Sequence, residues 1–280
     1  MTDQKSKILF VYDMPEWKQS LWMDGLWAAI QLLEKDFEIE QLNLSWSAEK
    51  IDPIIPHPST DDQRYDFVLG WGAFGSRVDK VLQPLPHKKG LCIGGNAMPP
   101  DGANAYDVLF YETKWYRPQI NFHKHIVHAF GINSDLFNQP NLPFPIVWDY
   151  LGVGAFALWK RWERLGDKKG MRMVVGEIQR ENLTESKIIC GRLLLEDGAM
   201  VSDMVHPFDL ANMYHWSRTL YIPADINGGG ERAVLEGRAC GLHVEIEDDN
   251  PKLQELLTGE IWDEKYYARQ LKQGILECLI

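Results

Sequence analysis

The chain has 280 residues, of which 45% are hydrophobic and 25% charged, and its formal net charge is −11 at pH 7. This composition is ordinary for a globular protein, and the length suits one large α/β domain or two domains of about 140 residues each. The acidic excess argues against broad nonspecific attraction to DNA or anionic lipid, although a local basic groove stays compatible with it.

The N-terminus and the cysteines indicate the cellular compartment. No run of about 18 apolar residues occurs, and MTDQKSK lacks the apolar core of a signal peptide, so we expect neither a membrane span nor secretion. The four cysteines are widely spaced and show no metal-ligand spacing, which is typical of reduced thiols. We therefore expect a cytoplasmic protein.

The first half alternates apolar strands with helical segments. KILFVYD (7–13) is predicted to be a buried strand, LWMDGLWAAIQLLEKD (21–36) has helical periodicity, and FEIEQLNL (37–44) alternates as a strand does. Four further strands are predicted at 65–72, 89–95, 106–112 and 125–131. Apolar strands that alternate with helices indicate a parallel sheet covered on both faces.

The three histidines in HKHIVHAF, His123, His125 and His128, raise the question of a metal site. His123 and His125 flank Lys124, whereas His128 would share a strand face with Ile126. This spacing makes a poor facial cluster, and no matching carboxylate is evident, so we expect no metal ion there.

The second half repeats the α/β theme after a linker. NQPNLPFPIV (138–147) carries three prolines and no periodicity. Apolar segments follow at 149–156, 170–179, 186–196, 219–225 and 241–248, together with a basic, helix-like piece at 159–169. We predict two Rossmann-like domains whose parallel sheets face each other across a cleft, with ligands outside the carboxyl ends of the strands. The predicted domains are 1–142 and 143–262, followed by a terminal helix at 263–280.

Three consecutive glycines, in NGGGERAVLEGRACG (227–241), precede a segment with helical periodicity. A glycine-rich turn at a helix N-terminus exposes N–H groups and the positive end of the helix dipole, which suits phosphate. The alternative is a helix with a flexible lead-in.

The second half resembles the C-terminal domain of the retaining GT-B glycosyltransferases of family four. Four segments carry the resemblance, in the order typical of that family: FGINSDLFNQP (130–140), VGAFALWKRWERL (153–165), MVHPFDLANMYHWSRTLYIPAD (204–225) and GGGERAVLEGRACGLHVEIEDDNPKL (228–253). The resemblance implies a GT-B fold, in which the terminal helix at 263–280 would pack back across the domain junction, and a nucleotide-sugar donor.

It also implies roles for single residues. Lys160 would neutralise the donor diphosphate and the charge that grows on it as the glycosidic bond breaks. Glu236 would accept hydrogen bonds from the ribose hydroxyls. Glu231 would hold sugar hydroxyls or act as a helix N-terminal charge. For Lys160 and Glu236 the alternative is an ordinary exposed helix charge.

Glycines complete the implied donor site, because they let backbone N–H groups approach phosphate or sugar. The remaining donor-binding candidates are Gly154, Gly228, Gly229, Gly230 and Arg232.

The chain departs from the family pattern twice. Ala155 stands where an arginine usually partners the lysine, and Arg161, Arg164 or Arg180 would have to replace that contact. Gly228 stands where the first glutamate of the family's spaced pair belongs, so that Glu231 or the backbone would have to take over its work.

Residues in loops after the strands of the first half are candidates for the acceptor side. Asp13 and Trp17 follow the first strand, and Glu112 and Trp115 follow the strand at 106–112. Glu112 is the best placed carboxylate if a base must activate the acceptor; a plain surface role is the alternative. The rings of Trp17, Trp71 and Trp115 suit stacking on sugars, or are simply core.

These expectations give a metal-independent, retaining hexosyltransferase that takes a nucleotide-diphosphate sugar as donor substrate and needs no cofactor. Its hydroxyl acceptor would be a glycan, a small molecule or a modified DNA base, the last requiring a basic groove such as Lys114, Arg117, His123 and Lys124 would supply. The rival hypothesis is a module that binds a nucleotide sugar without turnover, because the arginine and the first glutamate are absent.

Overall fold

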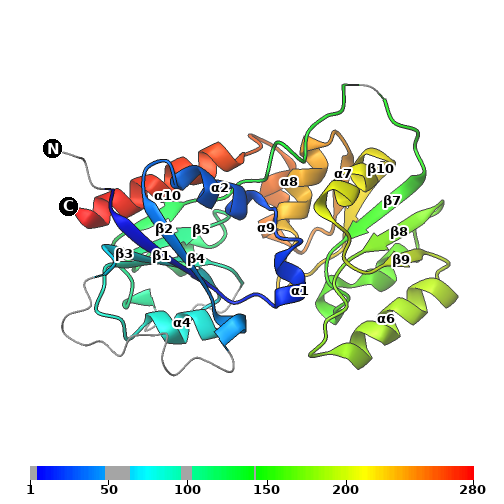
Figure 1. Ribbon diagram of the computed structural model, residues 1–280. Coiled ribbons are helices and arrows are strands. Elements are labelled where there is room, and N and C mark those ends of the chain that lie inside the picture. Colours follow the sequence, from blue (N-terminus) through cyan, green and yellow to red (C-terminus); the bar gives the residue numbers. More distant parts are fainter. Residues whose placement is uncertain (1–4, 48–63, 96–102, 142) are drawn as a thin grey trace. The chain divides into compact units, whose positions relative to one another are not determined.

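The computed structural model describes residues 5–47, 64–95, 103–141 and 143–280, which form two compact units (Figure 1). Unit 1 comprises the described residues up to Gly131 together with Asp263–Ile280, and unit 2 is Ile132–Trp262. The contacts thus divide the chain at Gly131, whereas the sequence suggested a division after residue 142. Residues 132–140 belong to unit 2 because they are bonded to it: Ile132 N donates to Trp262 O (3.0 Å), and the His215 ring bonds Asn138 O (2.8 Å).

Unit 1 contains a parallel sheet in the order β2-β1-β3-β4-β5-β6. Every residue of β4 and β5 is buried, because these strands are covered on both faces. The strands are β1 (Lys7–Tyr12), β2 (Glu38–Asn43), β3 (Phe67–Gly72), β4 (Lys89–Ile93), β5 (Val108–Tyr111) and β6 (Ile126–His128).

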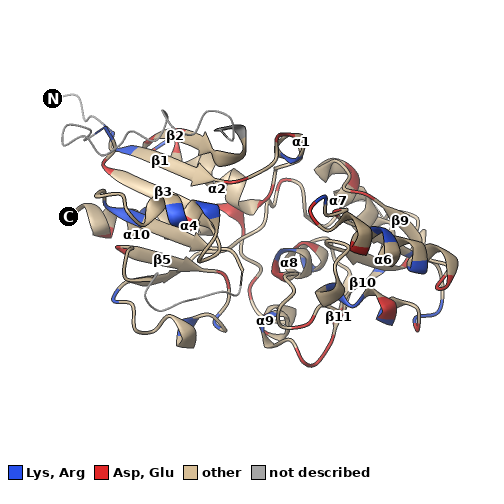
Figure 2. Ribbon diagram, turned by 90° about the horizontal axis from the view of Figure 1, so that it is seen from below, with Lys and Arg blue, Asp and Glu red and all other residues tan. Residues whose placement is uncertain are grey.

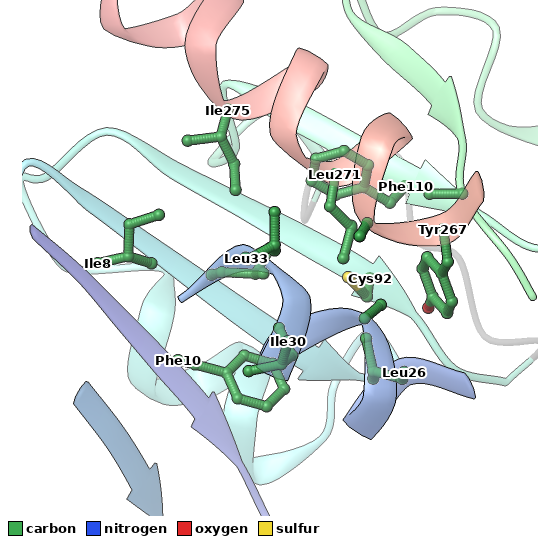
Figure 3. Packing of buried hydrophobic residues seen from close by; sticks show 14 of the residues in the cluster. Ile8, Phe10, Leu26, Ile30, Leu33, Cys92, Phe110, Tyr267, Leu271 and Ile275 are labelled. Atoms are coloured by element: carbon green, nitrogen blue, oxygen red, sulfur yellow. The ribbon is translucent and has the colours of Figure 1, made fainter. Parts of the chain in front are cut away.

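Helices α2 (Gly25–Leu33) and α10 (Glu264–Leu279) pack together on one face of this sheet. Each begins at an aspartate, Asp24 and Asp263, whose carboxylate accepts a hydrogen bond from a first-turn N–H. Figure 3 shows Ile30 and Leu33 of α2 and Leu271 of α10 in the resulting core. The terminal segment of the chain therefore completes the core of unit 1.

The shorter helical segments of unit 1 are α1 (Glu16–Gln19), α4 (Arg77–Leu82) and the 3-10 turns η1 (Leu44–Ser47) and η2 (Arg117–Gln119). Helix α4 supplies Val78 and Leu82 to a second core on the opposite face of the sheet.

Unit 2 contains a parallel sheet in the order β11-β10-β7-β8-β9. Its strands are β7 (Trp148–Val153), β8 (Arg172–Val175), β9 (Met200–Ser202), β10 (Ser217–Ile222) and β11 (His243–Ile246). Its helical segments are η3 (Leu158–Lys160), η4 (Trp162–Leu165), α6 (Leu183–Leu195), α7 (Pro207–His215), α8 (Glu231–Ala239), α9 (Pro251–Gln254) and η5 (Glu255–Leu257). Two parallel α/β sheets confirm the fold class predicted from the sequence.

The prediction that the basic segment at 159–169 is helical is wrong for a single continuous helix, because the structure has two short 3-10 turns there. Arg161 has φ +50°, in the left-handed region, and separates η3 from η4. Tertiary contacts hold this conformation, because the Arg161 guanidinium donates to Pro223 O (2.7 Å) and to both oxygens of Asp249 (2.6 and 2.7 Å).

No helix within the described residues has the length and hydrophobicity of a membrane span.

Candidate functional site

The strand order of unit 2 creates a switch point between β7 and β10. The chain runs outward from β7 through β8 to β9 on one side, and then through β10 to β11 on the other. Open parallel sheets bind ligands at such a point, beyond the carboxyl ends of the strands. The loops after β7 and β10 are joined there, because Asp225 N donates to Trp159 O (3.0 Å) and Lys160 Nζ donates to Gly229 O.

Packing explains two of the three glycines in the turn 228–230. A Cβ on Gly228 would lie 2.9 Å from Trp159 O, and a Cβ on Gly230, which has φ +154°, would lie 2.8 Å from Ile222 Cγ2. Gly229 is exposed, and a Cβ there would make only an ordinary contact, 3.4 Å from the Glu231 carboxylate. The turn therefore needs glycine at 228 and 230 for its own fold and leaves the backbone at Gly229 open.

The loop after β7 also depends on glycine. Gly154 has φ +151°, and a Cβ on it would lie 3.2 Å from Lys160 Nζ. A Cβ on Gly176 would lie 1.6 Å from Gly154 O, so that two backbone segments pass each other there at the closest approach. A side chain at either position would therefore disturb the loop that carries Lys160, whose Nζ donates to Gly229 O.

Glu231 is the first residue of α8 and is only 4% exposed. Its Oε2 accepts a hydrogen bond from Gly230 N (2.8 Å), and its Oε1 lies 3.3 Å from Nζ of Lys252, which is 1% exposed. Asn250 is fully buried and fixes the start of α9, because its Nδ2 donates to Ala224 O (3.0 Å) and to Asp225 O (2.8 Å). A buried ion pair therefore supports the glycine turn.

The electrostatics of this site centre on Lys160, which is 7% exposed. The pKa of Lys160 is lowered to about 8, chiefly by burial; the charges of Lys252 and Arg232 act in the same direction, and those of Glu231 and Asp225 oppose the shift. Three cationic groups thus face two carboxylates, and Figure 2 shows both signs along α8. Among these five groups the cations exceed the carboxylates by one, a balance that is favourable for an anionic ligand.

Glu236 lies farther along α8 and is 5% exposed. Its Oε2 accepts a hydrogen bond from the hydroxyl of Tyr214 (3.0 Å), which is itself fully buried. Burial and the Glu236 carboxylate hold the pKa of Tyr214 well above its usual value, so the hydroxyl stays a donor. Glu236, like Lys160, is a buried group and not an exposed helix charge.

Two of the three arginines considered as substitutes for the family's arginine are tied to carboxylates. Arg161 binds Asp249, as described above, and Arg164 pairs with Glu247. Arg180 is exposed in the loop after β8.

The acceptor-side candidates all lie in unit 1. Asp13 follows β1 and accepts a hydrogen bond from Ser45 Oγ (2.5 Å), with Arg77 Nη1 at 3.9 Å. Trp17 is half-buried in α1, and Trp71 stacks on Trp22, with ring centroids 5.7 Å apart.

The other two candidates follow β5. Glu112 is half-buried, and its charge adds to burial in raising the pKa of Cys92. Trp115 packs edge-to-face on Tyr116.

The three histidines have separate partners. Both ring nitrogens of His123 bond backbone oxygens, of His125 (2.8 Å) and of Tyr106 (2.8 Å). His125 pairs with Glu277 (2.8 Å), whereas His128 bonds the Tyr266 hydroxyl (2.9 Å). Within the part of the chain that the structure describes, no group of three His, Cys, Asp or Glu side chains could hold a metal ion.

Unit 2 thus brings together the predicted donor-site residues Gly154, Lys160, the 228–230 turn and Glu231. Arg232 and Glu236 lie with Glu231 on α8. Sequence reasoning missed Lys252 and Asn250. Lys252 follows Asn250-Pro251, a plain helix start, and nothing in that pattern distinguishes a buried lysine from an exposed one.

The sequence matches no protein-family model and no curated protein. Similar solved structures include sucrose-phosphate synthase from Thermosynechococcus elongatus (13% identity, TM-score 0.64), with 98% of this chain and 90% of that chain covered. The Anabaena protein HepE in complex with UDP and glucose (12%, 0.60) is covered to the same extent. These similarities extend over nearly the whole of this chain, which itself consists of two units that are each built on a parallel sheet. The fold is GT-B. An α-glucosyltransferase in complex with UDP-glucose and DNA containing an abasic site shares this fold (11%, 0.55; 98% and 91% covered).

Proposed function

We propose that this GT-B protein is a glycosyltransferase that moves a sugar from a nucleotide-diphosphate sugar to a hydroxyl acceptor. The observation that carries the proposal is the buried Lys160 at the 228–230 turn, within a site of surplus positive charge at the switch point of unit 2. A diphosphate supplies the missing negative charge, and the open backbone at Gly229 gives it access. The bound UDP and UDP-glucose of the similar GT-B structures support this choice of ligand.

Each buried group then has a role. Lys160 stabilises the diphosphate as the glycosidic bond breaks, and it acts strongly because its ammonium group is already desolvated. Glu236 accepts hydrogen bonds from ribose hydroxyls while it keeps that of Tyr214. Glu231 holds Gly230 N–H and so shapes the turn that faces the sugar.

Two finer features rest on the resemblance to family four. We propose that the anomeric configuration is retained, and that protein cations rather than a metal ion neutralise the leaving diphosphate. Glu112 of unit 1 is our candidate for a base that activates the acceptor. Product configuration determined by NMR and turnover in the presence of a chelator test the first two features.

The first experiment is thermal stabilisation by UDP, GDP, ADP and their sugars. A ligand at about 100 times its dissociation constant adds roughly 2.7 kcal/mol to the free energy of unfolding. We expect one nucleotide family to stabilise the wild type and not Lys160→Ala. Lys187→Ala, at an exposed position of α6, is the matched control and should behave as the wild type.

Turnover is measured next, as release of sugar from the stabilising donor. Hydrolysis that is lost in Lys160→Ala supports a transferase, whereas binding without hydrolysis or transfer would favour a nucleotide-sugar-binding module. Absence of stabilisation by every nucleotide would contradict the proposal.

A modified DNA base is the second candidate acceptor. Lys114, Arg117 and Lys124 are exposed in one segment of unit 1, and one similar GT-B structure contains DNA. His123, whose ring is occupied by backbone oxygens, contributes less than its sequence position suggests. Binding of duplex DNA that weakens steeply with salt, and that weakens further in Lys114→Ala/Lys124→Ala, would support this acceptor.

A further inference from the structure

The two departures from the family pattern remove opposite charges. Ala155 replaces an arginine and Gly228 replaces a glutamate, so that the chain lacks one cation and one anion at the loops after β7 and β10. Another pair of opposite charges is buried at the same place, namely Glu231 and Lys252.

The geometry puts this second pair under the turn. Lys252 comes from α9, and its Nζ lies 3.3 Å from Glu231 Oε1. The other oxygen of Glu231 accepts the N–H of Gly230, and the next backbone oxygen, of Gly229, accepts Lys160 Nζ. Lys252 is therefore connected to Lys160 through a carboxylate and one peptide segment.

We propose that Lys252 is a positioning residue of the diphosphate site, which holds Glu231 beneath the glycine turn and supplies the second positive charge in place of the absent arginine. This inference rests on the proposed function, since it assumes a diphosphate ligand. Lys252 is 1% exposed, so its charge acts through Glu231 and across the turn rather than by direct contact.

The charge of Lys252 also reaches Lys160. The groups that influence Lys160 are Glu231, Lys252, Arg232 and Asp225, and Lys252 acts to lower the pKa of Lys160. Loss of Lys252 would therefore raise that pKa, and loss of Glu231 would lower it. If Lys252 and Glu231 contributed only packing and no charge, replacing either residue would leave the pKa of Lys160 unchanged.

The test measures affinity for inorganic pyrophosphate and for UDP by calorimetry. Lys252→Met alone leaves the Glu231 carboxylate buried without its partner and could fail to fold. Glu231→Gln in turn leaves the buried Lys252 ammonium without its carboxylate, whereas the double variant Glu231→Gln/Lys252→Met orphans neither charge. The decisive comparison is therefore Glu231→Gln against the double variant, once circular dichroism and a cooperative melting transition show that both are folded. Lys187→Met is the control for loss of an exposed lysine.

We expect the double variant to bind pyrophosphate at least about tenfold more weakly than Glu231→Gln does. In the wild type, affinity should fall as the pH rises above about 8, where Lys160 loses its proton in the free protein. The midpoint of this fall should move to lower pH in Glu231→Gln and back toward higher pH in the double variant. Equal affinities and equal midpoints in the two variants would overturn the inference.

The wild type and Lys160→Ala separate this inference from the proposed function. If the wild type binds neither probe, both fail. If the wild type binds and Lys160→Ala does not, while Glu231→Gln and the double variant are alike, only the role of Lys252 fails.

Discussion

Replacing Lys160 by methionine should stabilise the ligand-free protein although it removes the cation that we propose binds the donor diphosphate. Burial lowers the pKa of Lys160 from 10.5 to about 8. At about 1.36 kcal/mol per pKa unit, keeping the ammonium group charged costs the folded protein about 3 kcal/mol. Methionine removes this cost, but it also removes the hydrogen bond to Gly229 O, which contributes about 1 kcal/mol to stability. We therefore expect a net increase of about 2 kcal/mol in the free energy of unfolding near neutral pH.

The pH dependence has a definite sign. The pKa of Lys160 is lower in the folded protein than in the unfolded chain, so the unfolded chain binds more protons between about pH 8 and 10.5. The wild type therefore gains stability as the pH rises through this window, and methionine does not titrate. The advantage of Lys160→Met should be greatest below pH 8 and should decline toward pH 10.5.

Urea unfolding followed by tryptophan fluorescence, at about pH 7 and about pH 10, measures this difference. Lys187→Met serves as the control, because Lys187 is exposed and should give the same small effect at both values. If Lys160→Met is less stable than the wild type at both pH values by the same amount, the ammonium group is not desolvated. The argument from surplus buried charge would then fail.

Three further outcomes follow from the structure. Gly176→Ala should lower the free energy of unfolding by at least about 3 kcal/mol, because its Cβ would lie 1.6 Å from Gly154 O; an unchanged melting temperature would refute this. Glu236→Gln should weaken UDP binding by about tenfold and leave pyrophosphate binding unchanged, and equal losses would exclude a ribose contact. Iodoacetamide should modify the half-exposed Cys190 before the buried Cys240, whose pKa burial raises to about 12; mass spectrometry that found the reverse order would contradict the burial.

The local sequence pattern was sufficient for the architecture. Strands such as Phe67–Gly72 and Val108–Tyr111 are short apolar runs between polar segments, and such runs are stable where helices cover both faces of a parallel sheet. The helical segment predicted at 21–36 corresponds to α2, which begins only at Gly25 because the Asp24 carboxylate caps it by satisfying a free N–H of the first turn.

The same kind of pattern failed where tertiary contacts outweigh local preference. The segment at 159–169 has helical composition, yet Arg161 adopts a left-handed conformation because Asp249 and Pro223 hold its side chain. Strand β9 has only three residues, Met200–Ser202, too few to show a period of two.

The candidate site, too, could be predicted from the sequence only in part. The glycine turn before α8 can be recognised from the sequence, because a glycine-rich turn before a helix has a local signature, whereas Lys160 and Glu231 were candidates only through the resemblance to family four. The sequence does not reveal which charged side chains are buried or how they pair, since the residue type alone does not distinguish a buried lysine from an exposed one. Only the fold brings Lys252 to Glu231, so the buried pair under the glycine turn is evident from the structure alone.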